Sequence, residues 1–320
     1  MVNRFQVLDG WRGISILLVL AGHLLPLGPK SWQMNGAVAA SGMVVFFILS
    51  GFLITNILLN KPNVTHFIIR RFMRIIPLAW LFMLIALILN YSNKDLYLPH
   101  FLFYANWEPM ALTSGTSHLW SLCVEMQFYI VIALLVASLR SKAFLLLPLL
   151  CFTVTAYRYY SNVEMAINTY YRVDEILAGC ILALLHNYST LIKRFISLLS
   201  PVYLIPLLIL SAHPESGAFN YFRPYIAMLT IGSTLFKQQT VWWNKWLGSK
   251  ALLYIASVSY ALYVIHGGLV HTWLGEGDTL EKYMKRPLLI AVTFLMAHIS
   301  TFYYENYWIR LGKRLTSRRD

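Results

Sequence analysis

Apolar segments recur along the whole chain, at roughly the 17–25 residues that a helix needs to cross a hydrocarbon core of about 30 Å. Inside lipid only helices and closed barrels satisfy their own backbone hydrogen bonds. Of 320 residues, 58% are apolar and 12% are charged, whereas soluble domains carry about a quarter charged residues. The sequence therefore predicts an all-α fold, a polytopic transmembrane helical bundle.

We expect about ten transmembrane helices, which leave no soluble domain to place, so residues 1–320 are predicted to form a single integral membrane domain. The first apolar run opens with Asp9 and Arg12 and lacks a small-residue cleavage site, which favours a retained helix over a signal peptide. The expected spans lie near 11–28, 37–59, 75–91, 119–138, 143–157, 172–187, 196–212, 222–236, 251–272 and 287–309.

The formal charge of +13 is explained by topology. Basic residues lie in short loops between apolar spans rather than on one soluble face, so no nucleic-acid partner is expected. The positive-inside rule predicts a multi-pass protein of the cytoplasmic (inner) membrane, with both termini in the cytoplasm. The basic residues assigned to the inner side are Arg4, Lys61, Arg70, Arg71, Arg74, Arg140, Lys142, Lys193, Arg194, Lys237, Lys245, Lys250, Arg310, Lys313, Arg314, Arg318 and Arg319.

Ionisable residues inside a bilayer are costly and are functional candidates by default. On the first span, Arg12 and His23 are eleven residues apart, which places them on one helical face with an axial separation of about 16 Å. On the fourth span, His118, Ser121 and Glu125 follow a spacing of three and then four residues and form one stripe. We therefore expect Glu125 near the depth of His23.

Further polar groups reach the same predicted layer. Arg172, Asp174 and Glu175 open the sixth span, and His266 lies near the outer end of the ninth. Buried polar residues also join membrane helices through hydrogen bonds, so a structural role stays open for these groups.

Three arginines, Arg70, Arg71 and Arg74, precede the third span, and Pro77 lies just inside it. Topology alone could explain them. A sharper hypothesis is phosphate binding, because neighbouring guanidiniums bind pyrophosphate in bidentate fashion, and coenzyme A carries such phosphates.

Six blocks occur in order along nearly the whole chain, and together they resemble the membrane-bound acyltransferase family 3, whose members acylate cell-surface carbohydrates. The blocks are LDGWRG at 8–13 with His23, FFILSGFLI at 46–54, RRFMRIIP at 70–77, HLWSLCVEMQFY at 118–129, RVDEILAG at 172–179 and SYALYVIH at 259–266.

The resemblance implies an Arg-x10-His motif at Arg12 and His23, an active-site histidine, and an acyl-CoA site open to the cytoplasm. Relatives commonly carry a second acid where this chain has Met126, and a serine where it has Cys123, which puts any role for adjacent carboxylates in doubt. The chain is also expected to lack the external hydrolase-like domain of some longer relatives.

We therefore predict an acyl-CoA-dependent O-acyltransferase. It would transfer an acyl group, most simply acetyl, to a hydroxyl of a cell-surface or lipid-linked carbohydrate. His23 would act as general base or as acyl carrier, supported by Glu125. Arg12, Arg70, Arg71 and Arg74 would bind the donor. No resident cofactor or metal is expected. The predicted supporting residues are Asp9, Ser50, His118, Ser121, Arg172, Asp174, Glu175 and His266.

Two other interpretations stay open. A secondary transporter also uses intramembrane charged residues, but it usually shows an internal repeat, which we do not find. A noncatalytic scaffold would tolerate replacement of all the polar residues above.

Overall fold

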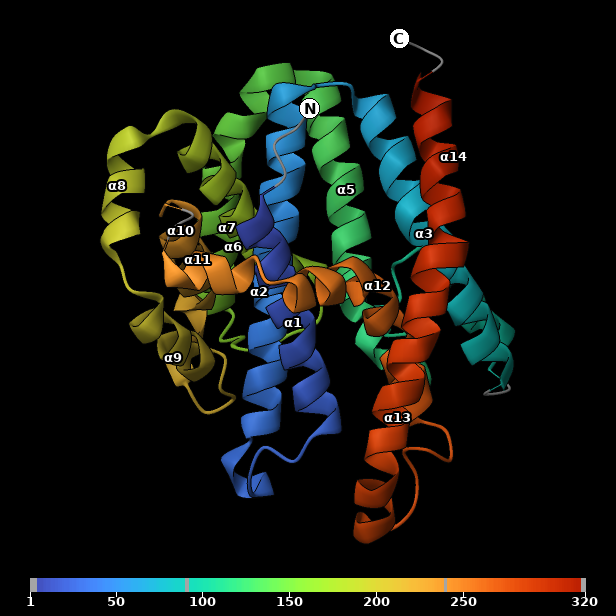
Figure 1. Ribbon diagram of the computed structural model, residues 1–320. Coiled ribbons are helices and arrows are strands. Elements are labelled where there is room, and N and C mark those ends of the chain that lie inside the picture. The colour runs from blue at the N-terminus through green and yellow to red at the C-terminus, as the bar shows by residue number, and fades with distance from the viewer. Residues whose placement is uncertain (1–4, 90–91, 239–240, 318–320) are drawn as a thin grey trace. The chain divides into compact units, whose positions relative to one another are not determined.

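The computed structural model describes residues 5–89, 92–238 and 241–317, which form helices and, within those ranges, no strand (Figure 1). The predicted all-helical class is confirmed. The long helices are α1 (Gln6–Leu24), α2 (Met34–Asn60), α3 (Val64–Leu89), α5 (Trp120–Leu139), α6 (Ala143–Tyr160), α7 (Thr169–Tyr188), α12 (Lys250–Val270) and α13 (Thr279–Ile299). Three residues used for the orientation, Arg4, Arg318 and Arg319, lie outside the described residues.

Shorter elements complete the described chain. The short α-helices are α4 (Tyr97–Phe101), α8 (Thr190–Leu198), α9 (Pro201–Ser211), α10 (Arg223–Leu235), α11 (Trp242–Leu247) and α14 (Asn306–Ser317). The 3-10 turns are η1 (Lys30–Trp32), η2 (Lys94–Leu96), η3 (Ser114–Leu119), η4 (Arg140–Lys142) and η5 (Gly217–Phe222). A π-helix, η6 (Ser300–Glu305), joins α13 to α14.

Six helical stretches of the described chain are long and apolar enough to cross a membrane, or seven if the bent pair α7 and α8 counts as one span. One stretch, Ser114–Tyr160, has 47 residues and contains two of the ten predicted spans. The predicted spans 196–212 and 222–236 coincide with the short helices α9 and α10. Between α7 and α8 the chain bends by 116°, where Ser189 caps α8 by accepting a hydrogen bond from the backbone N–H of Ile192.

The third predicted span begins too late. The structure starts α3 at Val64 rather than near residue 75, so Arg70, Arg71 and Arg74 lie on the helix instead of preceding it. Helical hydrogen bonding continues past the apolar segment, because charged residues are good helix formers outside lipid. Pro77 consequently lies in the middle of α3, where it leaves the carbonyl of Met73 without its helical donor.

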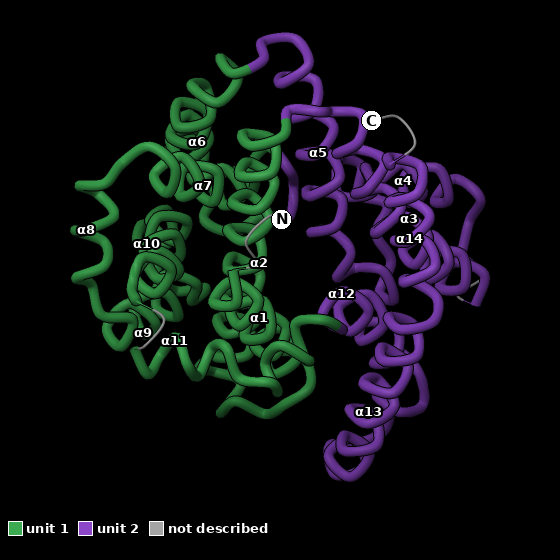
Figure 2. The backbone as a smooth tube through the Cα atoms, turned by 45° about the horizontal axis from the view of Figure 1, so that its top comes forward, with its two compact units in different colours: residues 1–61, 141–166, 170–257 green, residues 62–140, 167–169, 258–320 purple. Residues whose placement is uncertain are grey.

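The chain divides into two compact units (Figure 2). Unit 1 comprises residues 1–61, 141–166 and 170–257, and unit 2 comprises residues 62–140, 167–169 and 258–320. The prediction of a single domain stays a prediction.

Glycines bring the helices of unit 1 into close contact. A Cβ on Gly42 would lie 2.6 Å from the carbonyl oxygen of Ser15, so α1 and α2 pack backbone against backbone. The same holds for α2 and α7, since a Cβ on Gly51 would lie 1.9 Å from the oxygen of Ile176, and one on Gly179 would lie 2.1 Å from that of Ile48. Such small-residue contacts are typical of membrane helices.

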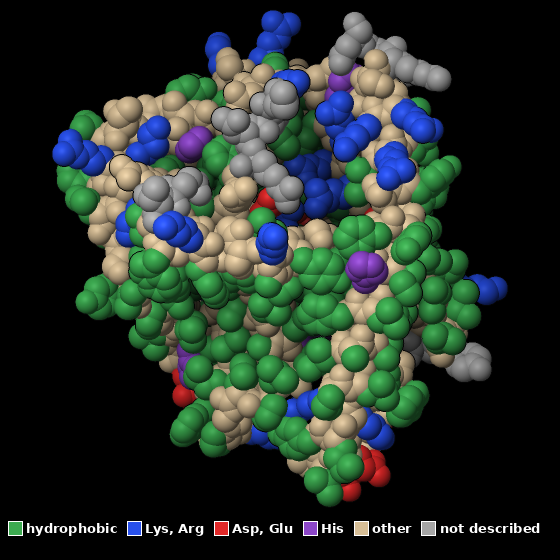
Figure 3. Space-filling view, viewed as in Figure 1, with side chains coloured by type: hydrophobic (Ala, Val, Ile, Leu, Met, Phe, Trp, Pro, Cys, Tyr) green, Lys and Arg blue, Asp and Glu red, His purple; other side chains and the backbone are tan. Residues whose placement is uncertain are grey.

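In unit 2, α14 packs along the first half of α3. The Arg70 side chain donates from Nε to Thr316 Oγ1 at 2.8 Å. The cytoplasmic segments predicted near residue 70 and near the carboxyl terminus thus lie at the same end of this unit. Figure 3 shows Lys and Arg side chains gathered over the C-terminal part of α14, which carries Arg310, Lys313 and Arg314.

Candidate functional site

The first helix carries Asp9, Arg12 and His23 without interruption. Their predicted spacing along one helix therefore holds. Asp9 lies in the first turn and His23 in the last, where the helix dipole favours a negative and a positive charge respectively. His23 is exposed, whereas Asp9 and Arg12 are half-buried.

Residues next to this motif fix α1 within unit 1. Trp11 is buried and donates from its indole nitrogen to Thr234 Oγ1 at 2.8 Å. A Cβ on Gly10 would lie 2.2 Å from the carbonyl oxygen of Leu247. The LDGWRG block therefore combines packing residues with the candidate donor-binding Arg12. Ser50 is also buried, on α2 beside the close contact at Gly51.

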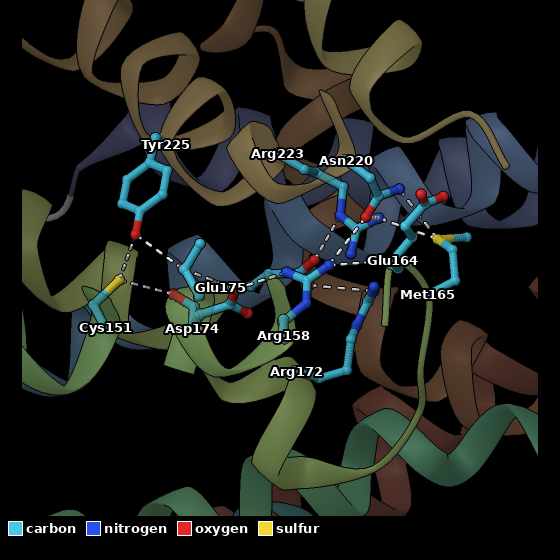
Figure 4. Close-up of polar contacts among 11 residues, drawn as sticks. Cys151, Arg158, Glu164, Met165, Arg172, Asp174, Glu175, Asn220, Arg223 and Tyr225 are labelled. Atoms are coloured by element: carbon cyan, nitrogen blue, oxygen red, sulfur yellow. Dashed lines mark hydrogen bonds and ion pairs between the residues drawn. The ribbon is translucent and has the colours of Figure 1, made fainter. Parts of the chain in front are cut away.

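A network of buried charges surrounds the start of α7 (Figure 4). Arg158 donates to Asp174 Oδ2 at 2.7 Å, and Thr155 donates to the same oxygen at 3.2 Å. The Arg158 guanidinium also donates to the backbone oxygen of Glu164 at 2.7 Å and to Asn220 Oδ1 at 3.0 Å. One arginine thus joins α6, α7, η5 and the loop after α6.

Glu175 is held by two further arginines in the same network. Its Oε1 accepts from Arg223 Nε at 2.7 Å, and its Oε2 lies 3.3 Å from Arg172 Nη2. Arg223 also donates to Asn220 Oδ1 at 2.9 Å, so one amide oxygen bridges Arg223 and Arg158. Breaking one partner of a buried pair is strongly destabilising, which favours a structural role for Asp174 and Glu175.

The sequence did not reveal Arg158 and Arg223 as partners of this network. Both arginines are buried, at 1% and 0% exposed. They lie near the end of α6 and at the first residue of α10. No local pattern signals such pairs, because Arg223 and Glu175 are 48 residues apart.

In unit 2, two histidines and a serine come together at the start of α5. His118 lies in turn η3 rather than on the helix, and the centroid of its ring is 5.0 Å from that of His266. Each histidine donates to a backbone carbonyl: His118 Nε2 to Val264 at 3.0 Å, and His266 Nδ1 to Tyr263 at 2.7 Å. Ser121 Oγ lies 2.6 Å from the Tyr263 hydroxyl. His118, Ser121 and His266, three of the residues predicted to share one layer, thus lie together in unit 2.

Glu125 lies one helical turn below, buried on α5. Its Oε1 accepts a hydrogen bond from the Tyr129 hydroxyl. Arg74 on α3 lies within electrostatic reach of Glu125, Tyr129 and a second acid, Glu305. Glu125 therefore belongs to a charged cluster that includes a residue of the predicted donor set.

Sequence reasoning missed Glu305. Glu305 is 6% exposed, and its Oε1 accepts from Ser300 at 3.1 Å and from Thr301 at 3.0 Å. An acid inside an apolar stretch is the signal that could have identified it.

Arg70 and Arg71 have different surroundings from Arg74. Arg70 is exposed, and the Arg71 guanidinium lies 5.9 Å and 5.8 Å from the ring centroids of Phe67 and Tyr129. Such cation–π contacts leave the N–H groups at the guanidinium edge able to bind an anion. Both arginines suit phosphate binding better than a residue already surrounded by carboxylates.

Two departures from the family pattern are explained by packing. Met126 and Cys123 are 2% and 1% exposed on α5. Cys151 and Cys180 are likewise buried and reduced, and they pack as small apolar core residues.

The described residues supply an exposed histidine on unit 1, and a carboxylate with flanking arginines on unit 2. The pairing of His23 with Glu125 stays a prediction, because these residues belong to different units. A histidine and a carboxylate are the side chains that acyl transfer to a hydroxyl requires, and arginines suit a phosphate-bearing donor.

Comparisons with known proteins agree with the motifs. Residues 5–308 match the family model described as Acyltransferase domain. The chain is 24% identical to the peptidoglycan O-acetyltransferase OatA of Listeria monocytogenes, over 93% of this chain and 54% of that protein. It is 26% identical to a Staphylococcus aureus protein named "Putative O-acetyltransferase SAR0937", over 98% of this chain and 58% of that protein.

The chain thus spans between half and three fifths of the length of these curated relatives. No solved structure matches it. The family model covers nearly the whole chain, and the described residues form apolar helices long enough to cross a membrane. The chain therefore belongs to the acyltransferase family 3.

Proposed function

We propose that the protein is a membrane O-acetyltransferase that moves an acetyl group from acetyl-CoA to a hydroxyl of a cell-surface or lipid-linked carbohydrate. The observation that carries this proposal is the family match over residues 5–308, together with relatives that are named O-acetyltransferases. The presence of His23 and Arg12 on one unbroken helix supports it.

The donor is proposed to bind from the cytoplasmic side. Its phosphates would be bound by Arg70 and Arg71, with Arg12 as a further candidate from the predicted set. The exposure of Arg70 and its contact with the basic helix α14 support this assignment, because they place a positive surface at one end of unit 2. Both termini are proposed to face the cytoplasm for the same reason of charge.

The proposed chemistry takes one of two routes at His23. As a general base, the imidazole accepts the proton of the acceptor hydroxyl while that oxygen attacks the thioester carbonyl. The C–S bond then breaks, and coenzyme A leaves as a thiol. As an acyl carrier, the imidazole nitrogen attacks the thioester carbonyl, the C–S bond breaks and coenzyme A leaves as a thiolate. The acetyl group then passes to the acceptor hydroxyl, whose proton is taken up by the thiolate or by solvent. In both routes Glu125 stabilises the imidazolium.

The test uses full-length protein in liposomes with labelled acetyl-CoA and a soluble N-acetylglucosamine oligomer as the acceptor probe. Wild-type protein should release coenzyme A and label the oligomer. His23→Gln keeps a hydrogen-bonding side chain but neither accepts a proton near neutral pH nor carries an acyl group. It should therefore lower turnover by about 10²- to 10⁴-fold.

Size-exclusion behaviour should match between wild type and the variant. Near-wild-type turnover by His23→Gln would move the assignment to His118 or His266. Flux of a substrate without release of coenzyme A would contradict the enzyme proposal and favour a transporter. Mass spectrometry of surface polysaccharides with and without the protein identifies the acyl group and the acceptor.

A further inference from the structure

Glu305 is the last residue of the π-helix η6, and the function proposed above does not use it. The carboxylate is buried, and two hydroxyls of the same π-helix, from Ser300 and Thr301, donate to its Oε1. A buried acid in a membrane-spanning stretch is costly unless it is paired. Short π-helices occur frequently at functional sites, because the extra residue changes the direction of the side chains that follow.

The turn of α3 that carries Arg74 is fixed next to this π-helix. Tyr304 of η6 donates to the backbone oxygen of Pro77 at 3.3 Å, and Tyr260 of α12 donates to that of Ile75 at 2.6 Å. Both carbonyls come shortly after Arg74 in sequence, on the part of α3 that contains the proline. The backbone around Arg74 is therefore tied to η6 and α12 by tyrosine hydroxyls.

The Arg74 guanidinium has an acid on two different elements. Glu125 on α5 and Glu305 on η6 both act on its positive charge. Glu125 in turn accepts from Tyr129, and Glu305 accepts from the hydroxyls of its own π-helix. Arg74 thus lies within electrostatic range of two buried carboxylates, and each carboxylate accepts a hydrogen bond from a hydroxyl group.

We infer that Glu305 is a positioning residue for acyl transfer: it holds the Arg74 guanidinium beside Glu125 and so sets the orientation and charge of Glu125. This inference rests on the proposed function. It separates Arg74 from Arg70 and Arg71, which face the donor. Arg74 acts on the reaction through Glu125, because its charge is matched within the protein.

Loss of the Glu305 charge leaves Glu125 as the carboxylate that balances Arg74. Glu125 is then held more tightly by the guanidinium and is less able to stabilise an imidazolium. The chemical step should suffer, whereas donor binding should not. A shift in kcat with an unchanged KM for acetyl-CoA distinguishes this role from a loss of donor binding.

The experiment measures coenzyme A release by full-length Glu305→Gln protein in liposomes. The amide keeps the shape of the side chain and an oxygen for Ser300 and Thr301, but it removes the charge. We expect kcat to fall about 10- to 100-fold, as misplacement of a reacting group does, with KM for acetyl-CoA within about twofold of wild type. Glu305→Asp restores the charge and should recover part of kcat.

The matched control is Glu281→Gln, on the preceding helix α13. Glu281 is 57% exposed and lies 3.8 Å from Lys285, so its substitution should leave kcat and KM unchanged. Thermal unfolding supplies a second measurement that does not depend on activity. Glu305→Gln and Arg74→Gln should each lower the unfolding temperature. The unfolding temperature of the double variant should be no lower than that of the less stable single variant.

Each outcome decides the inference. Additive thermal shifts would show that Glu305 and Arg74 are not coupled and would overturn it. Coupled shifts with wild-type kcat in Glu305→Gln would reduce Glu305 to a structural residue. A wild-type protein that releases no coenzyme A would overturn the proposed function and with it this role, whereas an active wild type with unaffected Glu305→Gln overturns the role alone.

Discussion

In unit 1, Asp174 and Glu175 each accept a hydrogen bond from an arginine at 2.7 Å, whereas in unit 2 Glu125 and Glu305 accept hydrogen bonds from tyrosine, serine and threonine hydroxyls. A buried carboxylate and an arginine form an ion pair, and removing either partner leaves an uncompensated charge inside the protein. A hydroxyl is neutral and can donate or accept, so it orients a carboxylate without forming an ion pair with it. The comparison indicates that the unit 1 network stabilises the fold and that the unit 2 cluster supports chemistry.

The largest effect is expected from Asp174→Asn, which tests whether the unit 1 network stabilises the fold. The substitution leaves the Arg158 charge buried without its ionised partner, and it should reduce the free energy of unfolding by about 3–5 kcal/mol. Turnover per folded molecule should change little. Thermal unfolding and active-protein titration measure the two quantities. Glu215→Gln, an exposed acid of the same unit that bonds Gln33, serves as the control and should have an effect within about 0.5 kcal/mol.

The reciprocal test is Glu125→Gln in unit 2. The amide still accepts from Tyr129 but cannot stabilise a positive imidazole, so kcat should fall by about 100-fold. The unfolding temperature should move much less than in Asp174→Asn. A variant that unfolds readily but retains its turnover would reverse the roles assigned to the two groups of carboxylates.

A smaller effect is expected from Arg70 and Arg71, the two arginines of α3 proposed to bind the donor. Arg70→Gln and Arg71→Gln should each raise KM for acetyl-CoA by about tenfold, equal to about 1.4 kcal/mol, with kcat retained. Arg74→Gln should instead lower kcat. Lys61→Gln, which removes an exposed positive charge from the same end of α3, is the control for nonspecific electrostatic attraction. Equal effects of all three arginine variants would contradict the division between them.

The smallest expected effect concerns His100 of unit 2, which lies outside the membrane-spanning segments and is also hydrogen-bonded to a hydroxyl group. His100 is fully buried, with Nε2 2.8 Å from Thr116 Oγ1 and Nδ1 2.7 Å from the backbone oxygen of Leu96. Burial lowers its pKa below the ordinary value of 6.5, although the Leu96 carbonyl opposes the shift. The neutral ring donates to Leu96 and accepts from Thr116.

The unfolded chain binds a proton at His100 more readily than the folded chain does. Acidification below pH 6.5 should therefore destabilise the segment around α4. Hydrogen exchange of residues 97–116 at neutral and acidic pH should show the loss of protection. His100→Gln should remove most of this pH dependence. Replacement of the exposed His271 by Gln should leave the pH dependence of hydrogen exchange unchanged. Identical pH profiles for the two variants would exclude His100 as the source of that dependence.

Much of the helical pattern was predictable, because apolar length and the 3.6-residue period are local properties. Arg12 and His23 were placed on one helix, and His118, Ser121 and His266 in one group. Arg158, Arg223 and Glu305 were not recognised as members of buried clusters. Their partners lie on helices distant in sequence, and the turn of a π-helix has no sequence signature that would bring Glu305 toward Arg74.

The crossing of α2 and α7 has a consequence for reading variant libraries of this protein. At Gly51 and Gly179 even an alanine methyl would occupy the place of a backbone oxygen of the other helix. Saturation mutagenesis should therefore recover glycine alone at both positions, whichever donor or acceptor is used for selection. Intolerance of substitution at Gly51 and Gly179, inside the FFILSGFLI and RVDEILAG blocks, would then reflect the close packing of the two helices. A screen for altered acceptor preference should leave these two codons unrandomised.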